Sequence, residues 1–272
     1  MKKILFFETR EFTGATRVTR TLAKAAAKDY QVAFAQVGDG VRKEVESAIH
    51  KENPDILFSS FVTINSDVID LGKEKGLEVF IRTDYKFADL SDELNNRIKE
   101  TYPKADLLIA QTAEMAADLK GIKGVRPERV EVVENLLDED AILQGASEPN
   151  PFPQNGKFHF LWVGREDPIK GLDTLKEAFS IANRQEPSID LTLITNAPNP
   201  YRWMKHCDCL VISSRSEASP NVLREALFLG AKVISTDCSP TVRDLLPSDR
   251  ICPTCNPEAL AELMLQTIHK QA

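Results

Sequence analysis

The feature that most constrains the fold of this 272-residue chain is a regular alternation of short apolar runs with longer segments of helical pattern. The runs are rich in Val, Ile, Leu and Phe, which is typical of parallel strands covered by helices on both faces. The candidate strands in the first half are Ile4–Phe7, Val32–Val37, Ile56–Ser59, Glu78–Arg82, Leu107–Ala110 and Val130–Val133. Those in the second half are Phe158–Val163, Ile189–Ile194, Leu210–Ser213, Val233–Ser235 and Arg250–Cys252.

The alternation is interrupted once, in the proline-rich polar segment 147–156, which is the best candidate for a linker. A chain of this length can bury a core in each of two medium-sized domains. We therefore predict an α/β protein with two Rossmann-like domains, residues 1–148 and 149–272.

Charge and hydropathy exclude several classes of protein. The chain has 34 Lys and Arg against 41 Asp and Glu, and this net charge of −7 argues against a general nucleic-acid binder. The apolar run near Met1 is too short for a signal peptide, and no later run approaches the length of a membrane span. We expect a cytoplasmic protein.

The segment 216–225 combines two acidic residues with the start of a helix. Ser219 suits the N-cap and Pro220 the first helical position, so the helix is predicted to continue to Leu229. Its free N–H groups and positive dipole end favour an anionic ligand such as a diphosphate. Glu217 precedes the helix, whereas Glu225 lies inside an apolar stretch. A carboxylate there needs hydrogen-bond donors, and a vicinal diol could supply two. A capping loop and a Glu paired with a nearby Arg would explain the same residues, and this segment alone leaves both interpretations open.

Several segments together resemble the retaining GT-B glycosyltransferases of glycosyltransferase family 4. The two glutamates with seven residues between them, filled by Pro-Asn-Val-Leu, are similar to the donor-site signature of that family. The resemblance covers most of the chain and extends to the segments Val163–Gly171, Ala231–Asp237, Ala105–Ala110 and Pro127–Asp138. It implies a GT-B architecture, with an N-terminal acceptor domain and a C-terminal domain that binds a nucleotide sugar.

The resemblance also implies roles for individual residues. Glu217 would hold hydroxyls of the donor sugar and Glu225 the ribose diol, with retention of anomeric configuration. Arg165 and Lys170 would neutralise the leaving diphosphate in place of a metal. A solvated loop after a strand would account for these two cations equally simply. The N–H groups around Ser219, Asn221 and Val222 complete the expected donor site.

The chain departs from the family pattern at three places. Only Gly14 remains of the expected glycine-rich loop, and a lone glycine often serves a turn alone. Asp84 stands near the position where many members carry a catalytic His, although an Asp there can also be a cap. The connection 195–209 is shorter than usual, so Tyr201 or Trp203 could stack on the base or pack a short helix against the sheet.

Cysteine and histidine spacing does not predict a metal centre. The five cysteines are an odd number in a chain without an export signal, and Cys209 opens an apolar run. None of the four histidines forms a His-X3-His pair. We expect free thiols, no metal and no cofactor.

One helix face is basic, because Arg17, Arg20, Lys24 and Lys28 fall within a narrow arc of the helical wheel. This face could meet acceptor phosphates or lipid headgroups at the inner face of the membrane. A solvated outer face explains the same pattern.

These observations predict a small, metal-independent retaining glycosyltransferase that uses a nucleoside-diphosphate sugar, with UDP favoured, and a saccharide or lipid-linked acceptor. A degenerate nucleotide-sugar-binding or partner subunit of the same fold is the alternative, and a GT-B sugar-nucleotide epimerase is a third. Assembly into an oligomer is compatible with all three.

Overall fold

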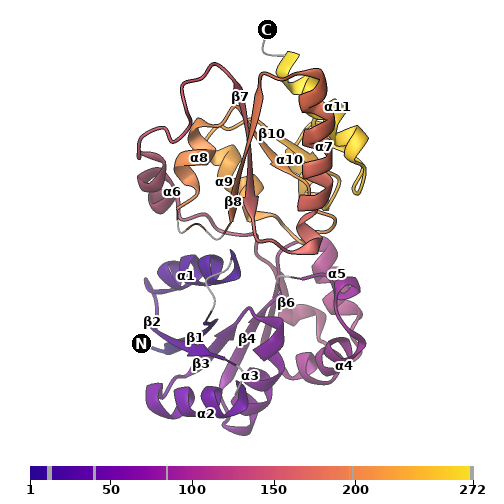
Figure 1. Ribbon diagram of the computed structural model, residues 1–272. Helices are drawn as coiled ribbons and strands as arrows, with labels where there is room; N and C mark the ends of the chain where they lie inside the picture. The colour runs from indigo at the N-terminus through magenta and orange to yellow at the C-terminus, as the bar shows by residue number, and fades with distance from the viewer. Residues whose placement is uncertain (11–13, 39–40, 84, 196, 198, 270–272) are drawn as a thin grey trace. The chain divides into compact units, whose positions relative to one another are not determined.

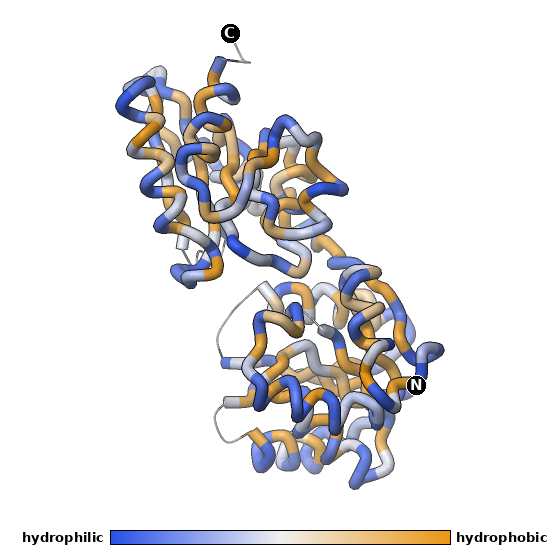
Figure 2. Tube along the Cα trace, turned by 90° about the vertical axis from the view of Figure 1, so that its right-hand side faces the viewer, coloured by the Kyte–Doolittle hydropathy of each residue, from blue (hydrophilic) through white to orange (hydrophobic). Residues whose placement is uncertain are grey.

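The computed structural model describes residues 1–10, 14–38, 41–83, 85–195, 197 and 199–269, and the chain divides into two compact units, Met1–Leu136 and Leu137–Ala272. Each unit is a parallel sheet with covering helices (Figure 1). Figure 2 shows orange and blue stretches alternating along the tube within each unit, as expected for amphipathic elements around buried strands.

The first unit contains a six-stranded sheet of order β2-β1-β3-β4-β5-β6. Its strands are β1 (Lys3–Thr9), β2 (Gln31–Val37), β3 (Ile56–Ser59), β4 (Glu78–Arg82), β5 (Leu107–Ala110) and β6 (Val130–Val132). Its helices are α1 (Gly14–Ala26), α2 (Val41–Glu52), α3 (Val62–Glu74), α4 (Asp92–Thr101) and α5 (Ala113–Gly121). The predicted strands of this half are confirmed.

The second unit contains a five-stranded sheet of order β11-β10-β9-β7-β8. Its strands are β7 (Phe158–Gly164), β8 (Ile189–Thr195), β9 (Cys209–Ile212), β10 (Val233–Thr236) and β11 (Ile251–Cys252). Its helices are α6 (Glu139–Ala146), α7 (Leu172–Gln185), α8 (Tyr201–His206), α9 (Asn221–Phe228), α10 (Pro240–Leu245) and α11 (Pro257–His269).

The second sheet is buried on both faces because successive side chains of a strand point to opposite sides. In β7, Leu161 joins a core cluster with residues of α6, α8 and α9, whereas Phe160 and Trp162 join a cluster with α7 and α11. Figure 1 shows α7 and α11 together on one side of this sheet. The continuous apolar runs of the sequence are thus explained by two separate cores, one on each face.

The division between the units differs from the predicted boundary at residue 148. Helix α6 belongs to the second unit, because Ile142 is buried in the core cluster that contains Tyr201 and Met204 of α8. The Pro-rich segment that follows α6 therefore lies within the second unit rather than between the two. Its Phe152 is buried in that same cluster.

Candidate functional site

Strand order identifies where the second unit is built to bind a ligand. From β7 the chain passes to β8 on one side, and it then returns to form β9 on the other side of β7. The connections that leave the carboxyl ends of β7 and β9 therefore run to opposite sides of the sheet. Such a switch point is where open parallel sheets bind ligands. The predicted residues Arg165, Lys170, Glu217 and Ser219 all lie on these two connections.

Lys170 and Glu217 meet at this switch point. The ammonium Nζ of Lys170 lies 2.6 Å from Oε1 of Glu217, and the two side chains are 24% and 14% exposed. The hydroxyl of Ser214 donates to the same carboxylate oxygen at 2.7 Å. The backbone N–H of Glu217 donates to Cys238 O at 3.0 Å, so the residue is also fixed to the connection that follows β10. The result is a partly buried charge pair whose members come from different connections.

The connection carrying Lys170 is shaped by a short turn. A 3-10 turn spans Pro168–Lys170, and Asp167 caps it by accepting a hydrogen bond from the N–H of Ile169 at 3.0 Å. Gly171 follows with φ of 61°, in the left-handed region that favours glycine. A Cβ at this position would also clash with the backbone oxygen of Ser213. The turn therefore requires glycine for two independent reasons.

Direct hydrogen bonds join the β7 and β9 connections. The Ser213 hydroxyl donates to Lys170 O at 2.9 Å, and the Arg215 N–H donates to Ile169 O at 2.7 Å. Arg215 also pairs with Asp173 at the start of α7. This hydrogen bonding raises the pKa of Arg215, whereas the pKa of Asp173 is lowered, chiefly by the backbone N–H of Thr174. The position of Lys170 is thus set mostly by backbone atoms.

Arg165 is at the start of the same connection but is not joined to the pair. Its guanidinium is 54% exposed and lies 3.8 Å from Asp167. Among the described residues, no contact from Arg165 to Lys170 or Glu217 is recorded. Within the second unit, the structure therefore brings Lys170 and Glu217 together and leaves Arg165 apart from them.

Helix α9 begins one residue later than predicted. Pro220 is its N-cap, with φ of −69° and ψ of 111°, and its carbonyl accepts the N–H of Leu223 at 3.2 Å. The prediction that Ser219 is the N-cap was wrong, because the extended backbone at Pro220 moves the helix start to Asn221. Ser219 is buried immediately before that start, and Val222 is the second residue of the helix.

Glu225 lies inside α9, as the apolar pattern predicted, and is only 4% exposed. The hydroxyl of Tyr201 on α8 is 3.4 Å from its Oε1. Tyr201 is itself 6% exposed and belongs to the core, so its ring packs against protein. Trp203, the other aromatic residue considered for base stacking, carries the Arg202 guanidinium 4.0 Å above its ring.

The structure describes some, but not all, of the predicted site residues of the first unit. Gly14 is the exposed first residue of α1, whereas Asp84 lies outside the described residues. Arg20, one member of the basic face, donates two hydrogen bonds to the carboxylate of Glu8, at 2.8 and 3.0 Å. Glu8 is 2% exposed at the end of β1. This pair was not predicted from the sequence; an acidic residue that closes an apolar run was a usable signal for Glu8, but it does not identify the partner.

The five cysteines all belong to the second unit. All five cysteines are free thiols, and burial raises the pKa of Cys207 to about 12 and of Cys252 to about 11. Burial and the negative charge of Glu217 raise the pKa of Cys238 to about 11. Within the described ranges, no three His, Cys, Asp or Glu side chains are grouped so that they could hold a metal ion.

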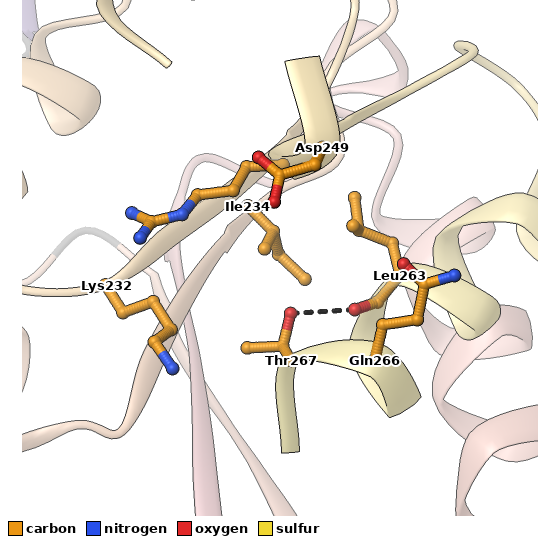
Figure 3. Close-up of a pocket in the computed structure, with 7 residues that line it drawn as sticks. Lys232, Ile234, Asp249, Leu263, Gln266 and Thr267 are labelled. Carbon is orange, nitrogen blue, oxygen red and sulfur yellow. Dashed lines mark hydrogen bonds between the residues drawn. The ribbon is translucent and has the colours of Figure 1, made fainter. Parts of the chain in front are cut away.

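A separate cavity of about 160 Å³ opens between β10 and the last turns of α11 (Figure 3). Lys232, Asp249 and Arg250 contribute its charged groups, and Thr267 donates to Leu263 O at 2.7 Å along its wall. Lys232 and Arg250 directly precede β10 and β11, so the cavity lies at the amino edge of the sheet. The Lys170–Glu217 pair lies at the opposite, carboxyl edge.

The part of the chain that the structure describes has no helix of the length and apolar character that a bilayer crossing requires.

One known family matches within the second unit. The family described as "Glycosyl transferases group 1" matches residues 195–270. An uncharacterized glycosyltransferase of Methanocaldococcus jannaschii is 28% identical over 193 residues, which are 58% of this chain and 45% of that protein. The second relative is N-acetylgalactosamine-N,N'-diacetylbacillosaminyl-diphospho-undecaprenol 4-alpha-N-acetylgalactosaminyltransferase of Campylobacter jejuni, 28% identical over 54% of this chain and 46% of its own length. The chain thus spans less than half the length of these relatives.

Solved structures match the whole chain. Anabaena HepE in complex with UDP and glucose has a TM-score of 0.74 at 13% identity, covering 100% of this chain and 91% of that one. Sucrose-phosphate synthase of Thermosynechococcus elongatus has a TM-score of 0.77 at 12% identity, covering 99% and 90%. At these identities the matches establish the fold alone. The predicted GT-B class is confirmed in its two parallel-sheet Rossmann-like domains.

Proposed function

We propose that this chain is a metal-independent, retaining glycosyltransferase that moves a sugar from a nucleoside-diphosphate sugar to a saccharide or lipid-linked acceptor. The first unit would receive the acceptor and the second the donor. The observation that carries the proposal is the Lys170–Glu217 pair at the switch point of the second sheet. UDP is the favoured nucleotide, since a structural neighbour binds UDP and glucose.

Lys170 is suited to neutralise the leaving diphosphate. An ammonium group has three donors, so it can keep its hydrogen bond to Glu217 and still donate to phosphate oxygens. Charge on the diphosphate grows as the glycosidic bond breaks, so a fixed cation stabilises the transition state more than the ground state. Arg165, exposed on the same connection, is the candidate second cation. Asp84 of the first unit, which lies outside the described residues, is also proposed as a catalytic residue.

Helix α9 supplies the other groups of the proposed donor site. The N–H groups of the first turn, at Asn221 and Val222, lie at the positive end of the helix dipole, which favours phosphate oxygens. Glu217 would accept hydrogen bonds from sugar hydroxyls, and Glu225, about one turn into the helix, those of the ribose. We propose that Ser219 and Gly14 also contact the nucleotide sugar.

The acceptor proposal is broader. The Campylobacter jejuni relative acts, by its name, on a diphospho-undecaprenol-linked sugar, which supports a lipid-linked acceptor here. The basic residues Arg17, Lys24 and Lys28 of the first unit would then face acceptor phosphates or anionic lipid headgroups at the membrane surface.

Nucleotide release tests the proposal directly. The protein is incubated with UDP-, GDP- and ADP-sugars, with and without saccharide and lipid-diphosphate acceptors, in buffer containing EDTA. Release that depends on acceptor and persists in EDTA, with the product retaining the donor's anomeric configuration by NMR, is the expected result. Sugar interconversion without release would instead identify an epimerase. Inversion of configuration or loss of activity in EDTA would overturn the mechanism.

A nucleotide-sugar-binding subunit without transfer activity is the second candidate. Two observations favour it: Arg165 is turned to Asp167, and the β8–β9 connection holds a single helix of six residues. Calorimetric binding of a nucleotide sugar without turnover in the presence of any acceptor would select this candidate.

A further inference from the structure

The short connection between β8 and β9 places a buried phenol against the buried carboxylate of α9. Tyr201 is the first residue of α8, and its hydroxyl oxygen lies 3.4 Å from Oε1 of Glu225. Tyr201 and Glu225 are 6% and 4% exposed. A buried phenol and a buried carboxylate each require hydrogen-bonding partners, so their contact stabilises both. The separation is long for an O–H···O bond, and a small displacement of α8 would break it.

Helix α8 is too short to hold Tyr201 in place alone, because an isolated helix of six residues is unstable in water. Asn199 provides the anchor. Its Oδ1 accepts the N–H of Tyr201 at 3.1 Å, and its Nδ2 donates to Gly145 O at 3.2 Å and to Glu148 Oε1 at 2.8 Å. One amide side chain thus joins the start of α8 to the end of α6.

Gly145 permits this close approach of α6 to α8. A Cβ at position 145 would lie 2.8 Å from Cδ2 of the Tyr201 ring and would clash with the Asn199 side chain. Arg202 reinforces the junction, since its guanidinium lies 3.2 Å from Oε2 of Glu148. Residues of α6, α8 and the segments beside them therefore fix the position of Tyr201.

We propose that Tyr201 is a positioning residue that holds the Glu225 carboxylate in the orientation that receives the ribose hydroxyls of the donor nucleotide. The inference rests on the proposed function, because it requires Glu225 to bind ribose. A carboxylate has about four acceptor sites, so donation by Tyr201 is compatible with donation from a vicinal diol. Tyr201 acts through Glu225 and does not itself touch the ligand.

This role predicts an effect on discrimination between ribose and deoxyribose. In the wild-type protein the Glu225 contact favours a ribonucleotide over its 2′-deoxy counterpart. Tyr201→Phe keeps the buried ring and removes only the hydroxyl, so the carboxylate gains freedom to leave its orientation. The affinity for the ribonucleotide should fall about tenfold, in the range expected for one hydrogen bond to a charged group. The affinity for the deoxynucleotide should change little, because it lacks the hydroxyl that Glu225 would hold.

Calorimetry with matched pairs of UDP and dUDP, GDP and dGDP, and ADP and dADP tests the proposal on the full chain. Tyr201→Phe is compared with Glu225→Gln, and Tyr30→Phe in the first unit is the matched control. Loss of the ribose preference in the first two variants, with the control unchanged, is the expected result. Thermal unfolding of each variant checks that folding is retained. A general loss of packing would weaken both members of a pair equally, which would overturn the positioning role.

The remaining outcomes separate this inference from the proposed function. A wild-type preference for ribose that Tyr201→Phe preserves overturns the role of Tyr201 and leaves the glycosyltransferase proposal intact. Equal wild-type affinity for both members of a pair overturns the ribose role of Glu225 and therefore this inference, while acceptor-dependent turnover still supports transfer. Failure of the wild-type protein to bind any of the six nucleotides overturns both.

Discussion

Lys170 and Glu217 form an ion pair that links the two connections of the second unit's switch point, with Nζ and Oε1 2.6 Å apart. The Glu217 carboxylate also receives the Ser214 hydroxyl, so it is held whether or not the lysine is present. The backbone carbonyl of Lys170 in turn accepts a hydrogen bond from the Ser213 hydroxyl on the β9 connection. A cation fixed in this way is ready to receive an anion without a large rearrangement, which is the condition for electrostatic catalysis.

Replacing Lys170 by Ala is expected to reduce turnover about 10²- to 10³-fold, the range found when one stabilising donor is removed from a transition state. Stability should fall by only about 1 kcal/mol, because the pair is partly solvated and Glu217 retains its bond from Ser214. Steady-state kinetics and thermal unfolding measure the two effects. Lys176→Ala, an exposed lysine on the adjacent helix α7, is the control. A large loss of stability with little change in turnover would make Lys170 a structural residue.

Gly171 and Gly230 offer a matched test of how the Lys170 turn is built. Both have positive φ, 61° and 74°, but a Cβ at 171 would clash with Ser213 O, whereas nothing lies within 4 Å of one at 230. Gly230→Ala should cost about 1 kcal/mol, from backbone strain alone. Gly171→Ala should cost at least twice as much. It should also lower turnover, because the turn must shift to relieve the clash with Ser213 O, and Lys170 shifts with it. Chemical denaturation of both variants gives the comparison. Equal costs would show that contact with Ser213 does not limit the turn.

The strands were predictable because their signals are local. β-branched and aromatic runs define β7 and β9, and ligand-binding residues at the ends of parallel strands must lie at one edge of the sheet. Lys170 and Glu217, 47 residues apart in sequence, are brought together by that topology. The N-cap of α9 was displaced by one residue because Pro220 is compatible with both positions, and only the observed ψ of 111° decides between them.

The domain boundary and the pairings of buried charges were not predictable in the same way. The Pro-rich segment after α6 has the composition of a linker, but burial of Ile142 and Phe152 against α8 is a long-range packing result. The contacts Tyr201–Glu225 (α8 with α9) and Glu8–Arg20 (β1 with α1) likewise depend on which elements pack together. No spacing rule along one segment identifies partners on two different elements.

Thiol reactivity provides a test of the cores around the cysteines. A raised pKa reduces the thiolate fraction at a given pH, so Cys238, with a pKa of about 11, is about one part in a thousand thiolate at pH 8. Cys255 is exposed, whereas Cys209, Cys238 and Cys252 are buried. An aromatic disulfide reagent at pH 8 should therefore label Cys255 first, and Cys255→Ser should abolish the fast phase. The other thiols should react only slowly in the folded protein and fully in denaturant. Fast labelling of several thiols in the folded Cys255→Ser variant would contradict the burial described for this unit.

The Glu8–Arg20 pair predicts that one arginine of the basic helix face is structural. Arg20→Met leaves the 2%-exposed Glu8 carboxylate without its bidentate partner, and this should destabilise the first unit by about 1–3 kcal/mol. This expected loss of stability is smaller than that for a fully buried pair because the Arg20 side chain is 51% exposed. Lys28→Met changes the same net charge at an exposed position beyond the end of α1 and should be nearly neutral. The double variant Glu8→Gln with Arg20→Met should recover part of the lost stability, since it removes the unpaired charge. Urea unfolding of the wild type and these three variants measures the differences in stability, and equal stabilities of the two single cation variants would show that the pair contributes nothing to the fold.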